Sequence, residues 1–117
     1  MFNNYFSNAI YKTALRLGVK PRNFNYTYNP EFNRSSYEFS LNGNNVIIVK
    51  FPYDSYELSV PNNPNLLLNL NAIIANTNLA YVGYDFYELP AANAIPSFIE
   101  LPTYNALVKA LNLIANN

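Results

Sequence analysis

Apolar residues recur at helical spacing in three stretches of the chain. From residue 2 to residue 17 they come every three or four positions, and Gly18, with Pro21 shortly after it, supplies a stop signal. A second stripe begins after Asn63-Pro64, a capping residue followed by a first-turn proline, and continues to about residue 76. A third stripe follows Thr103, the expected cap of the last helix. The chain is therefore predicted to contain three helices.

Alternation of apolar and polar residues predicts strands between the first two helices. Residues 23–29 alternate aromatic side chains with Asn and Thr until Pro30 ends the pattern, and residues 37–41 alternate up to Asn42-Gly43, a pair typical of tight hairpin turns. Residues 46–51 are apolar on both faces apart from Lys50, which predicts a central strand covered on both sides. We therefore expect a three-stranded antiparallel meander, and residues 53–60 leave room for another short strand.

The C-terminal half is less regular. Residues 79–89 are aromatic-rich and strand-like, whereas residues 90–102 are predicted to be irregular. The expected order is helix, three-stranded meander, helix, strand, helix, which predicts one small α/β domain of the α+β type over residues 1–117. The pattern Tyr-Asp-x-Tyr-Glu-Leu occurs at residues 53–58 and again at residues 84–89. Duplication of a strand-helix unit and chance explain this repeat equally well.

Composition narrows the function classes. The chain has no Cys and no His, so it has no disulfide, no Ser-His-Asp or Cys-His catalytic group and none of the usual zinc ligands. Its three glycines are isolated, which excludes a glycine-rich phosphate loop. We therefore expect no enzyme, no cofactor and no metal site. The two repeats supply candidate carboxylates for Mg²⁺ or Ca²⁺, but solvated or Tyr-paired carboxylates are the favoured interpretation. These carboxylates are Asp54, Glu57, Asp85 and Glu88.

Charge is scarce and unevenly placed. Only 12% of the residues are charged, while 22 of the 117 are Asn, so polarity comes from amides. Mutational bias toward A and T codons is the favoured explanation. Burial of an amide-rich surface in an assembly is the alternative, because amides cost less to desolvate than ions. Residues 1–36 contain five basic residues and one acidic residue, whereas the rest of the chain contains two and six.

The basic segment of residues 12–37 interleaves cations with aromatic rings, as single-stranded nucleic-acid binding requires. The favoured alternative is that the rings face the core of a half-buried strand while the cations are solvated. The candidate nucleic-acid-binding residues are Lys12, Arg16, Lys20, Arg22, Arg34, Phe24, Tyr26 and Tyr28.

The second predicted helix carries no charge. An exposed helix usually does, so its outer face is a candidate surface for a protein partner or a second copy. An equally good explanation is that Asn replaces charged residues throughout this chain. The candidate partner-binding residues are Asn65, Leu68, Asn69 and Asn76.

The leading hypothesis is a non-catalytic interaction or structural protein, of viral or other mobile-element origin, that assembles with a protein partner or with itself. A small nucleic-acid-binding protein is the second hypothesis, and an enzyme using Asp, Glu or Tyr is the third. The first residues lack a secretory signal pattern, and prolines and Asn interrupt the longest uncharged stretch. We therefore expect no membrane span and an intracellular or virion-associated location.

Overall fold

The computed structural model describes residues 5–53, 55–67, 69–70, 81–83 and 98–116. Residues 65–67 and 69–70 are helical, within the second helix that the sequence predicts. No helix in these described ranges is long and apolar enough to cross a membrane. The elements with stated bounds are α1 (Tyr5–Arg16), the 3₁₀ helix η1 (Pro21–Asn23), β1 (Asn25–Asn29), β2 (Arg34–Leu41), β3 (Asn44–Lys50), β4 (Tyr56–Ser59), β5 (Tyr81–Gly83), β6 (Phe98–Leu101) and α3 (Tyr104–Ala115).

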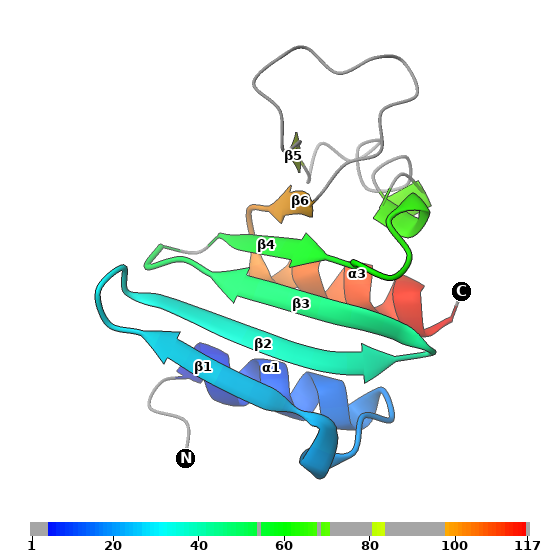
Figure 1. The fold of residues 1–117 in the computed structure, drawn as a ribbon, viewed down its shortest axis with the longest axis horizontal. Helices are drawn as coiled ribbons and strands as arrows, with labels where there is room; N and C mark the ends of the chain where they lie inside the picture. The colour runs from blue at the N-terminus through cyan, green and yellow to red at the C-terminus, as the bar shows by residue number, and fades with distance from the viewer. Residues whose placement is uncertain (1–4, 54, 68, 71–80, 84–97, 117) are drawn as a thin grey trace.

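The strands form one sheet in the order β1-β2-β3-β4-β6-β5, and every neighbouring pair is antiparallel. Helices α1 and α3 lie on the same side of this sheet, behind it in Figure 1. The prediction of a small mixed α/β domain with an antiparallel sheet is therefore confirmed. We call the side of the sheet that α1 and α3 cover the helix face and the other side the open face.

The three predicted strands are present, and β4 extends the meander to four within residues 53–60, where the sequence left room for another short strand. Strand β4 pairs with β3 from Ile47 opposite Ser59 to Lys50 opposite Tyr56. Its residues alternate between buried and half-buried, which places Tyr56 and Leu58 on the helix face. Four residues of alternating apolar and polar character are too few to predict a strand from the sequence alone. The backbone pairing with β3 establishes that this segment is a strand.

Residues 98–101 form strand β6, so the prediction of an irregular segment is wrong there. This strand inserts between β4 and β5 in the sheet, although β5 precedes it in the chain. Its Ile99 and Leu101 are buried on the helix face. The second copy of the repeat, residues 84–89, lies outside the described residues, as do residues 90–97.

Two local signals in the sequence act as predicted. Asn42 and Gly43 have φ angles of 53° and 78°, the left-handed conformation that a two-residue hairpin turn between β2 and β3 demands. The hydroxyl of Thr103 accepts a hydrogen bond of 3.1 Å from the backbone N–H of Ala106, which caps the start of α3.

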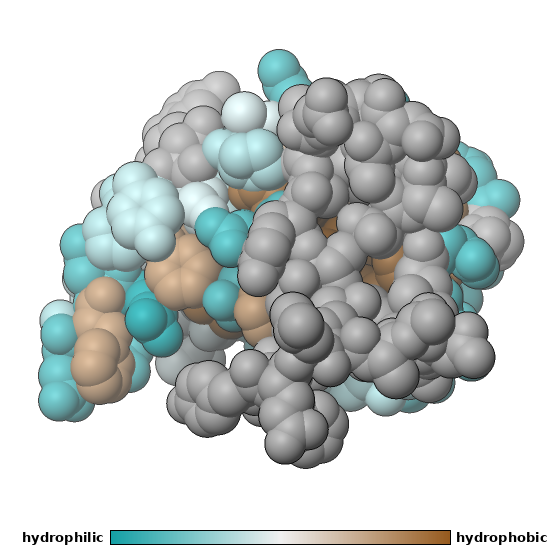
Figure 2. Space-filling view, turned by 90° about the horizontal axis from the view of Figure 1, so that it is seen from above, coloured by the Kyte–Doolittle hydropathy of each residue, from teal (hydrophilic) through white to brown (hydrophobic). Residues whose placement is uncertain are grey.

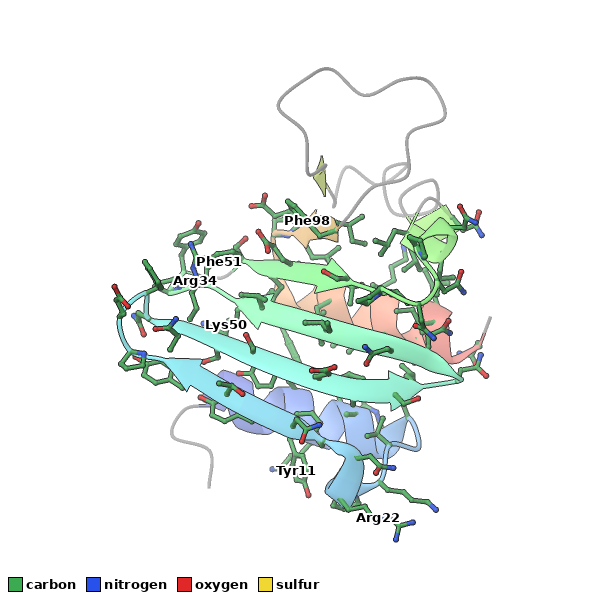
Figure 3. All side chains as sticks on the ribbon, in the orientation of Figure 1. Tyr11, Arg22, Arg34, Lys50, Phe51 and Phe98 are labelled. Carbon is green, nitrogen blue, oxygen red and sulfur yellow. The ribbon has the colours of Figure 1, made fainter. Side chains whose placement is uncertain are left out.

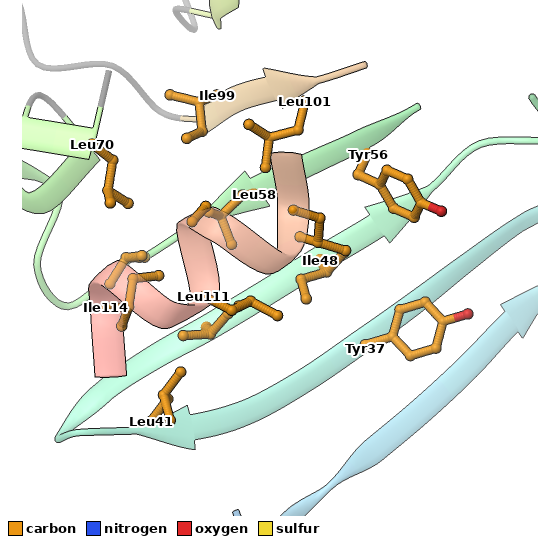
Figure 4. Packing of buried hydrophobic residues seen from close by; sticks show 14 of the residues in the cluster. Tyr37, Leu41, Ile48, Tyr56, Leu58, Leu70, Ile99, Leu101, Leu111 and Ile114 are labelled. Carbon is orange, nitrogen blue, oxygen red and sulfur yellow. The ribbon is translucent and has the colours of Figure 1, made fainter. Parts of the chain in front are cut away.

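The hydrophobic core lies between the sheet and the two helices (Figure 4). Strands β2, β3 and β4 supply Tyr37, Ile48 and Leu58, all of which are fully buried. Helix α3 supplies Leu107 and, one turn later, Leu111 from the predicted stripe. Helix α1 joins α3 through a hydrogen bond of 2.7 Å between the hydroxyls of Thr13 and Tyr104.

Strand β3 is central, as predicted, but only its helix face is fully covered. Val46 and Ile48 are buried there, whereas Ile47 and Val49 on the open face are half-buried. Among the described residues, both α1 and α3 lie on the other side of the sheet (Figure 1). The described residues therefore do not confirm the prediction that both faces of this strand are covered, since β-branched residues on a half-buried face produce the same uninterrupted apolar run.

Asparagine amides tie together the loops at one end of the sheet. The side-chain oxygen of Asn62 accepts a hydrogen bond of 2.7 Å from the Asn45 N–H, and its amide group donates to the Gly43 carbonyl. The amide group of Asn63 donates to the side-chain oxygen of Asn44 at 3.0 Å. These bonds join the β2–β3 turn to the loop after β4, so this part of the unusual Asn content has a structural role.

Candidate interaction surface

The turns β1–β2 and β3–β4 emerge at the end of the sheet opposite the amide-tied loops, and each carries an exposed ring. Phe32 in the first turn is 57% exposed and Tyr53 in the second is 65% exposed, while Tyr28 near the end of β1 is 46% exposed. These three are the exposed large hydrophobic side chains of the described part of the chain. Figure 2 shows brown hydrophobic atoms among teal polar ones at the left of the molecule, the side where Figure 1 places both turns.

Local hydrogen bonds hold the β1–β2 turn in shape. The side-chain oxygen of Asn29 accepts a bond of 3.0 Å from the N–H of Glu31, as in an Asx turn. Asn33 has a φ angle of 51°, and its side-chain oxygen accepts a bond of 2.8 Å from the Tyr28 hydroxyl. The turn therefore presents Phe32 on a constrained backbone.

Arg34 joins the two turns through aromatic contacts. Its Cζ atom lies 5.5 Å from the centre of the Phe32 ring and 4.8 Å from the centre of the Phe51 ring. The Phe51 ring in turn stacks on Tyr53 with 5.9 Å between centroids and 12° between planes. Figure 3 shows Arg34 and Phe51 together at this end of the sheet. We call Phe32, Arg34, Phe51 and Tyr53 the cation–aromatic surface.

Backbone hydrogen bonds hold the second turn. The N–H of Phe51 donates to the Ser55 carbonyl at 3.1 Å, and the N–H of Ser55 donates to the Tyr53 carbonyl at 2.7 Å. The ammonium group of Lys50 donates to the Phe51 carbonyl at 3.0 Å. The stacked rings therefore project from a turn that is held by hydrogen bonds to the backbone of Phe51, Tyr53 and Ser55.

Carboxylates oppose the positive charge of Arg34. Glu57 on β4 stands directly opposite Glu100 on β6 in the antiparallel register. Partial burial raises the pKa of Glu57 above its ordinary value, Arg34 lowers it, and the neighbouring Glu100 raises it. Glu100 itself accepts a hydrogen bond of 3.2 Å from the Ser55 hydroxyl. This end of the molecule therefore combines cations with carboxylates and carries no clear excess of positive charge.

The candidate nucleic-acid-binding cations do not all meet at one place. Lys12 and Arg16 are exposed on α1, while Lys20 and Arg22 are exposed just before β1. Arg34 stands opposite the last residue of β1, so the five-residue strand separates it from Arg22 by about 17 Å. Figure 3 shows Arg22 and Arg34 at different ends of the molecule.

The three candidate stacking rings have different environments. Phe24 is half-buried, lies edge-on to Tyr11 at 5.1 Å and is stacked on Phe39 at 5.6 Å. Tyr26 is half-buried against Tyr37 at 5.2 Å. Tyr28, at 46% exposure, is the one member of this trio that is classed as exposed. The other two rings are largely occupied by the core.

Two other sets of candidate residues, the partner-binding residues and the carboxylates of the repeat, lie only partly within the described residues. Asn65 and Asn69 are exposed on the helical segment after β4, and Leu66, Leu67 and Leu70 between and beside them are buried. Two proposed partner-binding residues, Leu68 and Asn76, lie outside the described residues.

Of the four repeat carboxylates, Glu57 is described, whereas Asp54, Asp85 and Glu88 are not. Among the described residues, no three Asp or Glu side chains come together as metal ligands would.

Sequence reasoning places Phe32 only within the basic aromatic segment of residues 12–37 and does not select Phe51 or Tyr53 as site residues. A usable signal is present, because each of these rings lies within two residues of a proline in a turn between strands. A large ring in a tight turn has little core to face, and Phe32 and Tyr53 are indeed exposed, whereas Phe51 is half-buried.

Comparison with known proteins adds no functional assignment. No family model, curated protein sequence or solved structure matches this chain.

Proposed function

We propose that this protein is a non-catalytic interaction protein that binds a segment of a protein partner at the cation–aromatic surface. One observation carries the proposal: the exposed large hydrophobic side chains of the described residues, Tyr28, Phe32 and Tyr53, all lie at the end of the sheet where Arg34 sits between two rings. Aromatic residues and Arg are the residue types enriched in protein interfaces and in their energetic hot spots.

The well-ordered conformation of the two turns also supports this function. Binding is weakened by the entropy lost when side chains and loops become ordered. Here Tyr28 bonds to Asn33 in the first turn, while Phe51 and Tyr53 stack in the second. A partner would therefore pay less of this ordering cost than on a surface of free side chains.

The surrounding charge favours an uncharged partner segment over a polyanion. Arg34 acts on the Glu57 carboxylate, which itself faces Glu100 across the strand pair. Phosphate binding depends on several cations placed along the backbone of the nucleic acid. We therefore expect partner segments rich in aromatic, aliphatic or prolyl residues, which gain from ring contacts and need no counter-charge.

A displayed random-peptide library tests this proposal. The wild-type protein should enrich peptides of that composition, and the double variant Phe32→Ala with Tyr53→Ala should bind them at least about ten-fold more weakly in fluorescence anisotropy. Both rings are exposed, so the double variant should melt close to wild type. The matched control changes Asn65 and Asn69 to Ala on the uncharged helical segment and should bind as wild type does.

An oligo(dT) strand provides the competing test. Weak binding that is the same in the wild type and in the double variant agrees with the proposal. The proposal is refuted if peptides are not enriched, or if the double variant binds them as tightly as the wild type. Oligo(dT) affinity that depends on Phe32 and falls steeply with salt would instead support the nucleic-acid function.

A further inference from the structure

Strand β1 has a sequence that reads the same in both directions. Its five residues are Asn25, Tyr26, Thr27, Tyr28 and Asn29. In a homodimer with two-fold symmetry, an antiparallel pair of identical strands places residue i opposite residue j and residue j opposite residue i. A palindromic strand centred on its own two-fold axis therefore matches itself at every position.

This strand is also at the edge of the sheet. Strand β1 is the first in the strand order and pairs with β2 alone (Figure 1). Its outer side thus presents backbone N–H and C=O groups that are not used by another strand of the described sheet. An edge of this kind is a template for pairing with a further strand.

Within β1 itself, the sequence features that usually prevent such pairing are absent. Proteins protect edge strands with charged side chains, internal prolines or bulges. Strand β1 has no charged residue and no proline, and its register with β2 runs without interruption from Asn25 opposite Glu38 to Asn29 opposite Arg34. Tyr and Thr, which fill its centre, favour extended backbone.

From these observations we infer that two copies of this chain associate through β1, antiparallel, with the two-fold axis at Thr27. The two six-stranded sheets then join into one continuous sheet of twelve strands. The inference does not rest on the proposed function, because it is argued from the backbone edge and the sequence of β1; Tyr28 is the one residue that enters both arguments. A failure of peptide binding at the cation–aromatic surface would leave it untouched.

The paired side chains are chemically compatible on both sides of the joined sheet. On the open face, Thr27 meets its own copy, and Asn25 meets Asn29 of the second copy, so hydroxyls and amides face each other. On the helix face, Tyr26 meets Tyr28 of the second copy. Tyr28 is 46% exposed in one copy and is available for an aromatic pair across the strands.

The residues that flank β1 add complementary charge. Exposed Lys20 and Arg22 precede the strand, and exposed Glu31 follows it. Antiparallel pairing brings the segment before β1 in one copy toward the segment after β1 in the other. Lys20 and Arg22 of one copy therefore approach Glu31 of the second at both ends of the pair, although exposed Arg34, opposite Asn29, lies at the same end as Glu31; a parallel arrangement would place Lys20 and Arg22 of the two copies together.

Sedimentation equilibrium tests the association. The wild type should show a concentration-dependent monomer–dimer equilibrium, and Thr27→Lys should weaken it about five-fold or more because two like charges then oppose each other on the axis. A mixture of Thr27→Lys and Thr27→Glu should dimerise at least as well as wild type. Ser40→Lys, an exposed position of the open face on β2, is the matched control and should not change the equilibrium.

Single cysteines test the register, since the chain has no cysteine of its own. Opposed residues of an antiparallel pair have Cα atoms about 4.5–5.5 Å apart, within the range of a disulfide. Thr27→Cys alone should therefore oxidise to a covalent dimer much faster than Ser40→Cys. Asn25→Cys and Asn29→Cys should each form no disulfide-linked dimer alone, because about 14 Å then separates the two cysteines, and they should crosslink when mixed.

Any of the following results would overturn the inference. The first is a wild type that stays monomeric at its highest soluble concentration. The second is a Thr27→Lys variant that dimerises as the wild type does. The third is a Thr27→Cys variant that crosslinks no faster than Ser40→Cys, or an Asn25→Cys variant that crosslinks with itself.

Discussion

Helix α3 stabilises the fold chiefly through the side chains that it buries against the sheet, and Leu107→Ala measures that contribution. Leu107 is fully buried in the core cluster that includes Leu58 of β4 and Leu101 of β6. The substitution removes three buried carbon atoms, worth about 2.4 kcal/mol in transfer free energy, and leaves a cavity that raises the cost to about 3 kcal/mol. That is a large share of the total, since domains of this size unfold at a cost of about 5–15 kcal/mol.

Leu113→Ala is the matched control on the same helix. Leu113 is only half-buried against the core, so its truncation should cost about 1 kcal/mol while changing helix propensity equally. Urea unfolding followed by circular dichroism compares the two variants. With an m value of about 2 kcal/mol/M, Leu107→Ala should lower the midpoint by about 1.5 M and Leu113→Ala by about 0.5 M. Equal shifts would show that α3 does not pack on the sheet through Leu107.

Three further substitutions test the cap, the hairpin and the carboxylate pair. Thr103→Ala removes the cap bond to Ala106 and should cost about 1 kcal/mol, seen as a melting temperature lower by about 4 °C. Gly43→Ala meets no atom within 4 Å but sits at a φ of 78°, so backbone strain of about 1 kcal/mol should appear as a lower urea midpoint. Glu57 has a pKa raised above 4.5 in the folded state, so the wild type loses stability as pH rises from 4.5 through the raised value, and Glu57→Gln does not. Urea titrations at pH 4 and pH 7 give the free energy of unfolding of both proteins. The value for Glu57→Gln, relative to that of the wild type, should be higher at pH 7 than at pH 4. A relative stability that is the same at both pH values would contradict the raised pKa of Glu57.

The candidate site shows where sequence reasoning stops. Phe32 and Phe51 are 19 residues apart in the chain and contact the same Arg34 guanidinium. The local sequence of neither turn predicts that the two rings contact the same arginine. It follows from the sheet order, which puts the β1–β2 and β3–β4 turns at the same end of neighbouring strand pairs. In the sequence, Arg34 was grouped with Arg22, although β1 separates the two.

The palindromic sequence of β1 is the converse case, in which the pattern is visible in the sequence but its consequence depends on the fold. Its symmetry is fully present in the sequence, but the sequence does not say whether the strand is central or at an edge. In a central strand the same pattern would carry no consequence, because both sides of the backbone would be paired already. Only the sheet order, with β1 first, leaves one side available.

The sequence by itself determined the features that depend on residues within about four positions of one another. The left-handed turn at Asn42-Gly43, the Thr103 cap and the apolar stripe of α3 all belong to this class. Such features arise from steric limits on φ and from bonds that close within one helical turn. These features can therefore be predicted from the sequence without knowledge of the rest of the fold.

Only the tertiary structure decided which strands pair and which faces are covered. Strands β4 and β6 are four residues long, and their register with each other depends on segments more than 40 residues apart. Which face of β3 the two described helices cover likewise depends on where α1 and α3 pack. Burial is a property of the assembled layers, so an apolar residue such as Val49 looks the same in the sequence whether its face is open or closed.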